Sequence, residues 1–409
     1  MNLLDTYKKR GDDLQGLKEE LEKMDASTEL MKINSDDLEV LAYAPRLTKT
    51  PPNGVGFFSF SRRTFSARQR SGDNEIHCFQ KAAFDKSLFD EMANGPMFLL
   101  QYGPKAMYCS EKTLTTLQQR CGLAGQWLTV PSLERNEAIA RALSDASVKM
   151  SLILRTTCIA GKKVSKVFAA PSATYSTSKL SHIYEYIKGL MTELPEYGAT
   201  LKFWENTHRL TTAYVEFPLF GETTSKSFGL PEVIIPGVLI RSSETCNSSF
   251  MVTGTLRLQG CKEYILRTDA PGTFAAQHSG TTFDLPKMLE QSRDCMKAAQ
   301  HLLKQIAMAT YDVVSIKTKA TAKRTIMSYV REMQLTGMLG KNRSKAIQDA
   351  LIEHFEKQPE VSAYDIAMQL FRFEEYLEGG SEHVEDRIRK AMSKAIGVRL
   401  KTKTVTLEV

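Results

Sequence analysis

The residues of this sequence whose types and spacing best suit a chemical role are cations, and the first group stands beside aromatic rings. Segment 54–70 contains four phenylalanines followed closely by four arginines. Arginine neutralises phosphate and an aromatic face can stack a base, so this combination suits single-stranded nucleic acid. A strand that buries its phenylalanines and displays its arginines to solvent is the alternative; we favour it for the phenylalanines and a polyanion contact for the arginines. The candidate phosphate contacts are Arg62, Arg63, Arg68 and Arg70, and the candidate stacking residues are Phe57, Phe58, Phe60 and Phe65.

Two further groups of cations are candidate polyanion contacts. The first marks the tip of a predicted hairpin and comprises Lys162, Lys163 and Lys166. Between residues 317 and 345, eight Lys or Arg stand against one acid, Glu332, so this stretch alone has a net charge of +7, equal to that of the whole chain. A charged helix face is also an ordinary hydrated surface, so both interpretations stay open. The candidates in this stretch are Lys317, Lys319, Lys323, Arg324, Lys341, Arg343 and Lys345.

The motifs of common enzymes and cofactor sites are absent from the sequence. It contains no Gly-x-x-x-x-Gly-Lys-Ser/Thr, no Gly-x-Gly-x-x-Gly, no His-Glu-x-x-His and no Gly-x-Ser-x-Gly. The seven histidines never form a close pair. We therefore predict no cofactor, no metal ion and no catalytic residue, and an enzyme is the less favoured class. A site assembled from distant residues stays open, because geometry rather than spacing decides it.

The composition predicts a globular protein. The chain has 409 residues, of which 42% are hydrophobic and 25% charged, which excludes a disordered chain and predicts two or three structural units. No apolar run approaches the ~18–20 residues that cross a bilayer, and the first residues lack the pattern of a signal peptide. Seven widely spaced cysteines without a Cys-x-x-Cys pair are typical of reduced thiols. We expect a cytoplasmic protein without a membrane partner.

The elements that must position the cations are predicted to be of mixed type. Residues 1–30 have apolar side chains at helical spacing (Leu14, Leu17, Leu21 and Met24), and this stripe must pack on the body of the protein or on a neighbouring subunit. Strands and helices then alternate from about residue 53 to 270. The predicted strands are 150–158, 164–169, 210–217, 233–240 and 250–258, and the predicted helices are 132–147 and 179–194.

After Asp284 the pattern becomes helical. Asp284 can cap a helix that extends to residue 308, and Ser362 with Asp365 resembles a capping box. Further helices are predicted near 319–336, 343–357, 362–378 and 381–396. We therefore predict an α+β fold, with a central mixed or antiparallel sheet and helices, followed by an all-helical C-terminal third. The predicted domains are an N-terminal helical segment for packing or oligomerisation (1–50), an α+β core (51–310) and a helical, basic-then-acidic region (311–409).

The order of motifs in the second half resembles a known family. Segment 236–244, the strand 250–258, Cys261 and then His278-Ser279-Gly280 before a long helix follow one another as in the phage/plasmid-like proteins of a large domain-of-unknown-function family. The likeness covers about 90–400 and departs at Ser242, Cys246 and the pair after Cys261. The resemblance implies a mobile genetic element and the cytoplasm of its host, and it implies no reaction.

Three classes of function follow from these observations. The leading hypothesis is a non-enzymatic nucleic-acid-binding protein of a phage or plasmid, a homo-oligomer that binds or anneals single-stranded DNA during replication or recombination. The alternative is a protein-interaction module, such as an inhibitor or decoy of a host defence system. A nuclease with scattered carboxylates is the third. The sequence leaves open whether the nucleic acid is DNA or RNA and whether it is single or double stranded.

Overall fold

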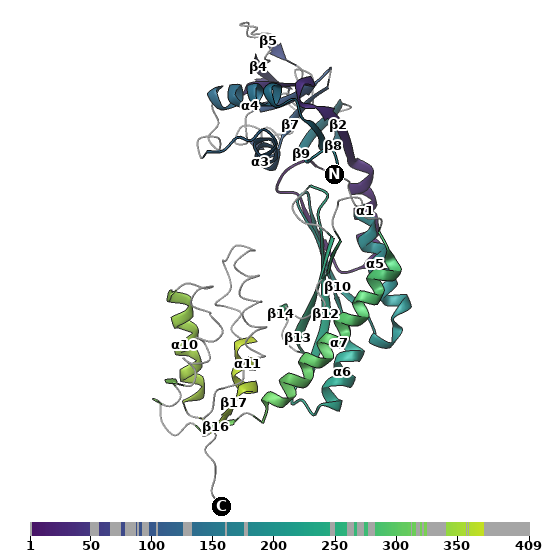
Figure 1. Cartoon of the computed structure of the whole chain (residues 1–409), viewed down its shortest axis with the longest axis vertical. Helices are drawn as coiled ribbons and strands as arrows, with labels where there is room; N and C mark the ends of the chain where they lie inside the picture. Colours follow the sequence, from purple (N-terminus) through teal and green to yellow (C-terminus); the bar gives the residue numbers. More distant parts are fainter. Residues whose placement is uncertain are drawn as a thin grey trace, which may run out of the picture.

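The body of the molecule consists of two β-sheets, which we name sheet A and sheet B, each with helices on one face (Figure 1). The predicted α+β class is therefore confirmed. The computed structural model describes residues 2–49, 57–65, 75–77, 87, 90–91, 98–103, 105–125, 133–159, 162–175, 179–245, 250–259, 266–267, 274–276, 283–311, 313–315, 320, 323–324, 341–356, 358 and 360–371.

Sheet A is antiparallel, in the order β1-β10-β11-β12-β13-β14, with β15 also paired to β13. The predicted strands at 210–217, 233–240 and 250–258 are present as β11, β12 and β13. The strands are β1 (Lys8–Gly11), β10 (Thr200–Thr207), β11 (Thr211–Glu216), β12 (Ile234–Ser242), β13 (Phe250–Leu258), β14 (Leu266–Arg267) and β15 (Phe274–Ala276).

Three helices, α1 (Leu14–Ser27), α5 (Ser181–Glu193) and α7 (Leu285–Ala309), cover one face of sheet A, and α6 (Pro218–Ser227) packs beside β12 (Figure 1). Alternate strand residues such as Val238 and Ile240 join the helices in one buried cluster, as the side-chain period of a strand requires. The predicted cap is confirmed, because Asp284 accepts a hydrogen bond from the Lys287 amide at 3.1 Å. A short 3-10 helix, η3 (Pro195–Tyr197), follows α5.

Sheet B has the order β2-β8-β9-β7-β6-β3-β4-β5, and its only parallel pair among the described strands is β7 with β9. The predicted hairpin around Gly161 is confirmed as β8 and β9. Helices α3 and α4 cover one face over a core that includes Leu100, Leu117 and Leu152. The elements are β2 (Thr28–Asn34), η1 (Ser35–Asp37), β3 (Leu38–Lys49), β4 (Phe57–Phe65), β5 (Glu75–His77), β6 (Phe98–Tyr102), β7 (Lys105–Cys109), α3 (Glu111–Arg120), α4 (Leu133–Ala146), β8 (Lys149–Ile159) and β9 (Lys162–Ala169).

The prediction of a separate N-terminal helical segment over 1–50 is wrong. Within the described residues 2–49, α1 is the only α-helix, while β1 pairs with β10 in sheet A, and β2 and β3 pair with β8 and β6 in sheet B. The segment therefore belongs to both sheets. The apolar stripe packs on the body of the protein, since Leu17, Leu21 and Met24 are fully buried in the core of sheet A.

The described part of the C-terminal third contains α10 (Lys341–Phe355) and α11 (Ala363–Phe371), together with the two-stranded pair β16 (Val313–Ser315) and β17 (Glu360–Ser362). These three-residue strands were not predicted, because they are too short to show a period of two. The predicted cap at Ser362 is confirmed, since its hydroxyl donates to Asp365 at 2.7 Å and accepts from the Asp365 amide at 3.0 Å. Predicted helix 381–396 lies outside the described residues, as does nearly all of 319–336. None of the helices in the described ranges is long and apolar enough to cross a membrane.

We expect Leu21→Ala to lower the free energy of unfolding by about 2–4 kcal/mol, because it leaves a cavity under sheet A. Urea unfolding should give this loss independently of protein concentration, as burial within one chain requires. Glu19→Ala on the exposed side of the same helix should change the free energy by less than about 0.5 kcal/mol. A concentration-dependent loss in Leu21→Ala would instead place the stripe between subunits.

Candidate nucleic-acid interface

The first predicted group of site residues lies on β4. The backbone of this strand pairs with β3, placing Arg62 opposite Tyr43, Arg63 opposite Ala42 and Phe65 opposite Val40. The alternative interpretation of this segment assumes a strand, and the strand is present. It also contains Phe57, Phe58 and Phe60. Arg68 and Arg70 lie outside the described residues, so the contacts proposed for this group stay predictions.

The prediction for the hairpin tip is wrong at Lys166. Lys163 is exposed near the start of β9, whereas Lys166 is 1% exposed. Its ammonium group donates to the Leu3 carbonyl at 2.9 Å and to Asp5 Oδ1 at 2.8 Å, and it also pairs with Glu91. The reason is that β9 is an inner strand, flanked by β8 and β7, and residues 3, 5 and 91 cover the face on which Lys166 lies. Lys162 begins the strand, and its side chain lies outside the described part.

The third predicted group is only partly described. Lys323, Arg324 and Lys345 are exposed. Lys341 and Arg343 belong to α10, and their side chains are not described. Lys317 and Lys319 lie outside the described residues. The structure does not gather the three predicted groups, because β4 and α10 lie at opposite ends of the molecule (Figure 1).

A basic strand that the sequence analysis missed lies at one edge of sheet A. Lys8, Lys9 and Arg10 occupy successive positions of β1, and all three are exposed. Residues 1–50 contain 8 Lys or Arg and 11 Asp or Glu, so the net charge of this stretch is negative. A charge count over the whole stretch therefore hides the three adjacent cations of residues 8–10. Three adjacent cations were the signal that could have identified it.

Arg10 presents its guanidinium group on an aromatic ring. Its Cζ atom lies 5.1 Å from the centroid of Phe203 on β10, and this half-buried ring packs in turn on Tyr214 at 5.7 Å. Within the described ranges, no carboxylate forms an ion pair with Arg10. A guanidinium plane stacked on a ring keeps its N–H donors directed outward, where a phosphate can accept from them.

Two lysines flank this stack, and we name Lys8, Arg10, Lys202 and Phe203 the β1 platform. Lys8 pairs with Glu205 at 2.7 Å and Lys202 with Glu216 at 3.5 Å. The lysine side chains are 58% and 42% exposed, so a phosphate can compete for each of them. The pair of Lys8 with the partly exposed Glu205 contributes at most about 1 kcal/mol, and the buried Glu216 keeps a second partner in Arg257. Lys9 points to the opposite face of the sheet, toward Glu20 at 3.2 Å.

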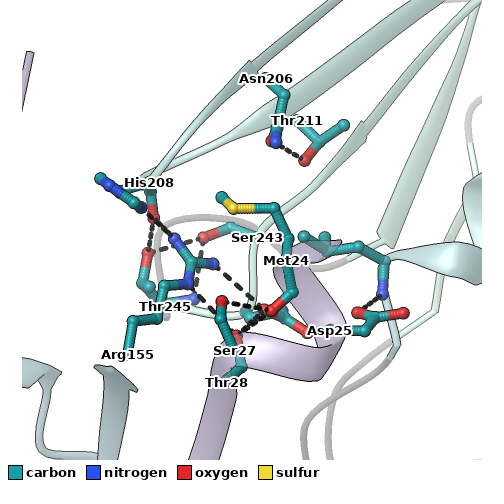
Figure 2. A network of polar contacts seen from close by, with 12 residues as sticks. Met24, Asp25, Ser27, Thr28, Arg155, Asn206, His208, Thr211, Ser243 and Thr245 are labelled. Carbon is teal, nitrogen blue, oxygen red and sulfur yellow. Dashed lines mark hydrogen bonds and ion pairs between the residues drawn. The ribbon is translucent and has the colours of Figure 1, made fainter. Parts of the chain in front are cut away.

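A buried polar cluster around Arg155, which we name the junction cluster, joins the two sheets (Figure 2). Arg155 of β8 is 1% exposed and donates to Glu244 Oε2 at 3.1 Å, to Thr28 Oγ1 at 3.2 Å and to the His208 carbonyl at 3.2 Å. Since His208 follows β10 and Glu244 follows β12, this one side chain of sheet B is bonded to two connections of sheet A.

The tautomer of His208 follows from its partners. Its Nε2 lies 2.8 Å from the Asn2 carbonyl, which can only accept, so Nε2 carries the proton. Nδ1 then accepts from Arg155 Nη1 at 2.7 Å. The ring also stacks on Tyr7 and contacts Phe168. Burial, together with the charge of Arg155, lowers the pKa of His208 to about 3, so the imidazole is neutral at neutral pH.

Glu244 has the opposite shift. Burial raises the pKa of its carboxyl group to about 7, although Arg155 acts against the shift, and the neighbouring Asp25 carboxylate adds to it. Asp25 itself accepts from the Leu180 and Ser181 amides at 2.8 and 3.0 Å at the start of α5. The cluster thus also connects α1 to α5.

The described residues contain no group of three His, Cys, Asp or Glu placed to hold a metal ion. No family model, curated protein or solved structure matches the chain. The resemblance to the phage/plasmid-like family therefore depends on the sequence motifs alone.

We expect Arg155→Met to lower the free energy of unfolding by about 3–5 kcal/mol, because Glu244, Thr28 and His208 lose a buried donor. Arg141→Met is the matched control, since the Arg141 side chain is 62% exposed and pairs only at the surface with Glu137. Urea unfolding of both variants measures the difference. Equal losses would mean that the junction cluster does not stabilise the fold.

The junction cluster also predicts how stability depends on pH. Glu244 titrates near 7 in the fold instead of at its ordinary 4.5, so its contribution is present at low pH and is lost as the pH rises through 7. His208 titrates near 3 instead of 6.5, so its contribution is present above 6.5 and is lost as the pH falls toward 3. We therefore expect maximum stability between about pH 5 and 6.5.

The variant Glu244→Gln separates the two contributions. It keeps the shape and an acceptor oxygen but cannot titrate. In the wild type the loss from Glu244 and the gain from His208 cancel between about pH 4.5 and 6.5, so the variant should instead gain stability over that range and should not lose it between about pH 6.5 and 7. Urea unfolding at a series of pH values measures this difference. A wild-type and a Glu244→Gln profile that run parallel between about pH 4.5 and 7 would contradict the assignment.

Proposed function

We propose that this protein binds nucleic acid without catalysing a reaction, and that the β1 platform is one of its contact surfaces. The observation that carries the proposal is the exposed guanidinium of Arg10, stacked on Phe203 and flanked by Lys8 and Lys202. Cations that neutralise phosphates supply most of the affinity of such proteins, and an aromatic ring supplies a stacking surface.

A single strand of DNA is the ligand that suits this arrangement best. The exposed guanidinium of Arg10, supported by the Phe203 ring, can stack an unpaired base, and the adjacent lysines can bind the backbone beside it, whereas the bases of a duplex are not available for stacking. The exposed Lys163, Lys323, Arg324 and Lys345 are further candidates for backbone contacts, although they do not adjoin the platform.

The setting of this function is part of the same proposal. On the resemblance to the phage/plasmid-like family, the protein would act in the host cytoplasm. As a hypothesis independent of that resemblance, it is a homo-oligomer that binds or anneals single strands during replication or recombination. Annealing needs neither a nucleotide nor a metal ion, and the sequence contains no phosphate-binding loop.

The test is a titration with a labelled single-stranded oligothymidine at about 50 and about 200 mM salt. We expect binding at the lower salt concentration, weakening as salt rises. The triple variant Lys8→Ala, Arg10→Ala, Lys202→Ala should lower the slope of log Kd against log salt by about 2, since each phosphate contact on a single strand contributes about 0.7. Phe203→Leu should weaken binding by about tenfold with an unchanged slope.

The matched control is Lys188→Ala, Arg293→Ala, Lys297→Ala. It removes the same residue types and the same charge, from exposed positions of α5 and α7 on the helix-covered side of sheet A. It should reduce the slope much less. No binding by the wild type at low salt would refute the proposed function, and equal effects of the two triple variants would refute the platform as its site.

A further inference from the structure

The segment that leads into β1 is held by side chains of both sheets. The Asn2 carbonyl accepts from His208 at 2.8 Å, and the Leu3 carbonyl accepts from Lys166 at 2.9 Å. Asp5 pairs with Lys166 at 2.8 Å. The hydroxyl of Tyr7 donates to Glu20 at 2.6 Å. Four of the six residues before β1 thus have partners far away in the sequence.

We propose that Lys166 and His208 are positioning residues of the β1 platform: they anchor segment 2–7 and thereby hold the cations of β1 in place. This inference rests on the proposed function. Neither side chain touches the platform, because Lys166 is enclosed beneath Leu3 and Asp5, and His208 lies between Tyr7 and Phe168.

The anchoring is needed because β1 has few contacts of its own. It has four residues, and in the described part of the chain it pairs only with β10. Ordering each backbone residue costs about 1–2 kcal/mol of conformational entropy, and exposed edge strands of this length fray readily. Hydrogen bonds to the buried Lys166 and His208 order the chain immediately before Lys8. The entropy cost of ordering this segment is therefore met in folding and does not weaken the binding of a ligand.

The buried position of Lys166 makes the anchor specific. An ammonium group at 1% exposure must be paired, and its partners Asp5 and Glu91 come from two separate segments. Its Nζ also lies 5.2 Å from the Tyr108 ring and 5.1 Å from the Phe168 ring. Displacement of segment 2–5 would remove the carbonyl of Leu3 and the carboxylate of Asp5 together. The segment therefore has one stable position.

The test combines hydrogen exchange with a double-mutant cycle. Lys166→Met keeps an unbranched side chain of nearly the same length and removes the charge. We expect amide exchange in residues 2–11 to rise at least about tenfold, with little change in β11 to β13. We also expect oligothymidine binding to weaken by about tenfold in the otherwise unchanged protein, and by less than about twofold when Lys8, Arg10 and Lys202 are already alanine.

Asp5→Asn is the second variant, for the case that Lys166→Met fails to fold. Asp5 is partly exposed, and the substitution removes the ion pair while keeping the shape. It should raise exchange in the same residues and weaken binding in the same direction, by a smaller factor.

Each outcome decides the inference. If Lys166→Met lowers the affinity equally with and without the platform cations, or does not lower it at all, the positioning role is overturned while the proposed function stays intact. Faster exchange throughout both sheets would show general destabilisation and would also overturn it. Absence of binding by the wild type would refute the proposed function, and the positioning role with it.

Discussion

The structure depends on two cations that are buried where the sheets meet. Arg155 and Lys166 lie on adjacent strands of sheet B, and each is 1% exposed. Removing a charge from water costs several kcal/mol unless partners replace the lost hydration. Those partners come from elsewhere in the chain, namely Glu244, His208 and the carbonyl of Leu3. The need to satisfy two charges therefore determines how the connections of sheet A and the first residues of the chain approach sheet B.

This constraint links the stability of the fold to the candidate site. The same segment that covers Lys166 continues directly into β1, whose outer side chains include Lys8 and Arg10. The buried cations therefore hold the exposed ones in position. The two sets differ in what they require. Lys166 already has two carboxylate partners, whereas Arg10 is exposed and rests on the ring of Phe203. The charge of a residue alone does not show which of these roles it has.

Much of the fold was predictable because its signals are local. The strand at 250–258 alternates, Asp284 and Ser362 are caps, and Gly161 marks a hairpin, and each pattern lies within about ten residues. The signals that failed were those of pairing over long distances. Strand β1 pairs with residues about 200 positions away, and β16 pairs with β17 across some 45 residues. In so short a strand, nothing in the local sequence requires a partner.

The candidate site shows the same division. The sequence by itself determined that the protein is α+β, where the strands β8, β9 and β11 to β13 and helices such as α4, α5 and α7 lie, and that its cations are segregated, because composition, side-chain period and capping chemistry are properties of neighbouring residues. Only the tertiary structure decided which cations face solvent. Lys163 and Lys166 are three positions apart on one strand, yet one is exposed and the other is enclosed by residues 3, 5 and 91. Burial is set by what packs against a side chain, and those residues come from distant parts of the chain.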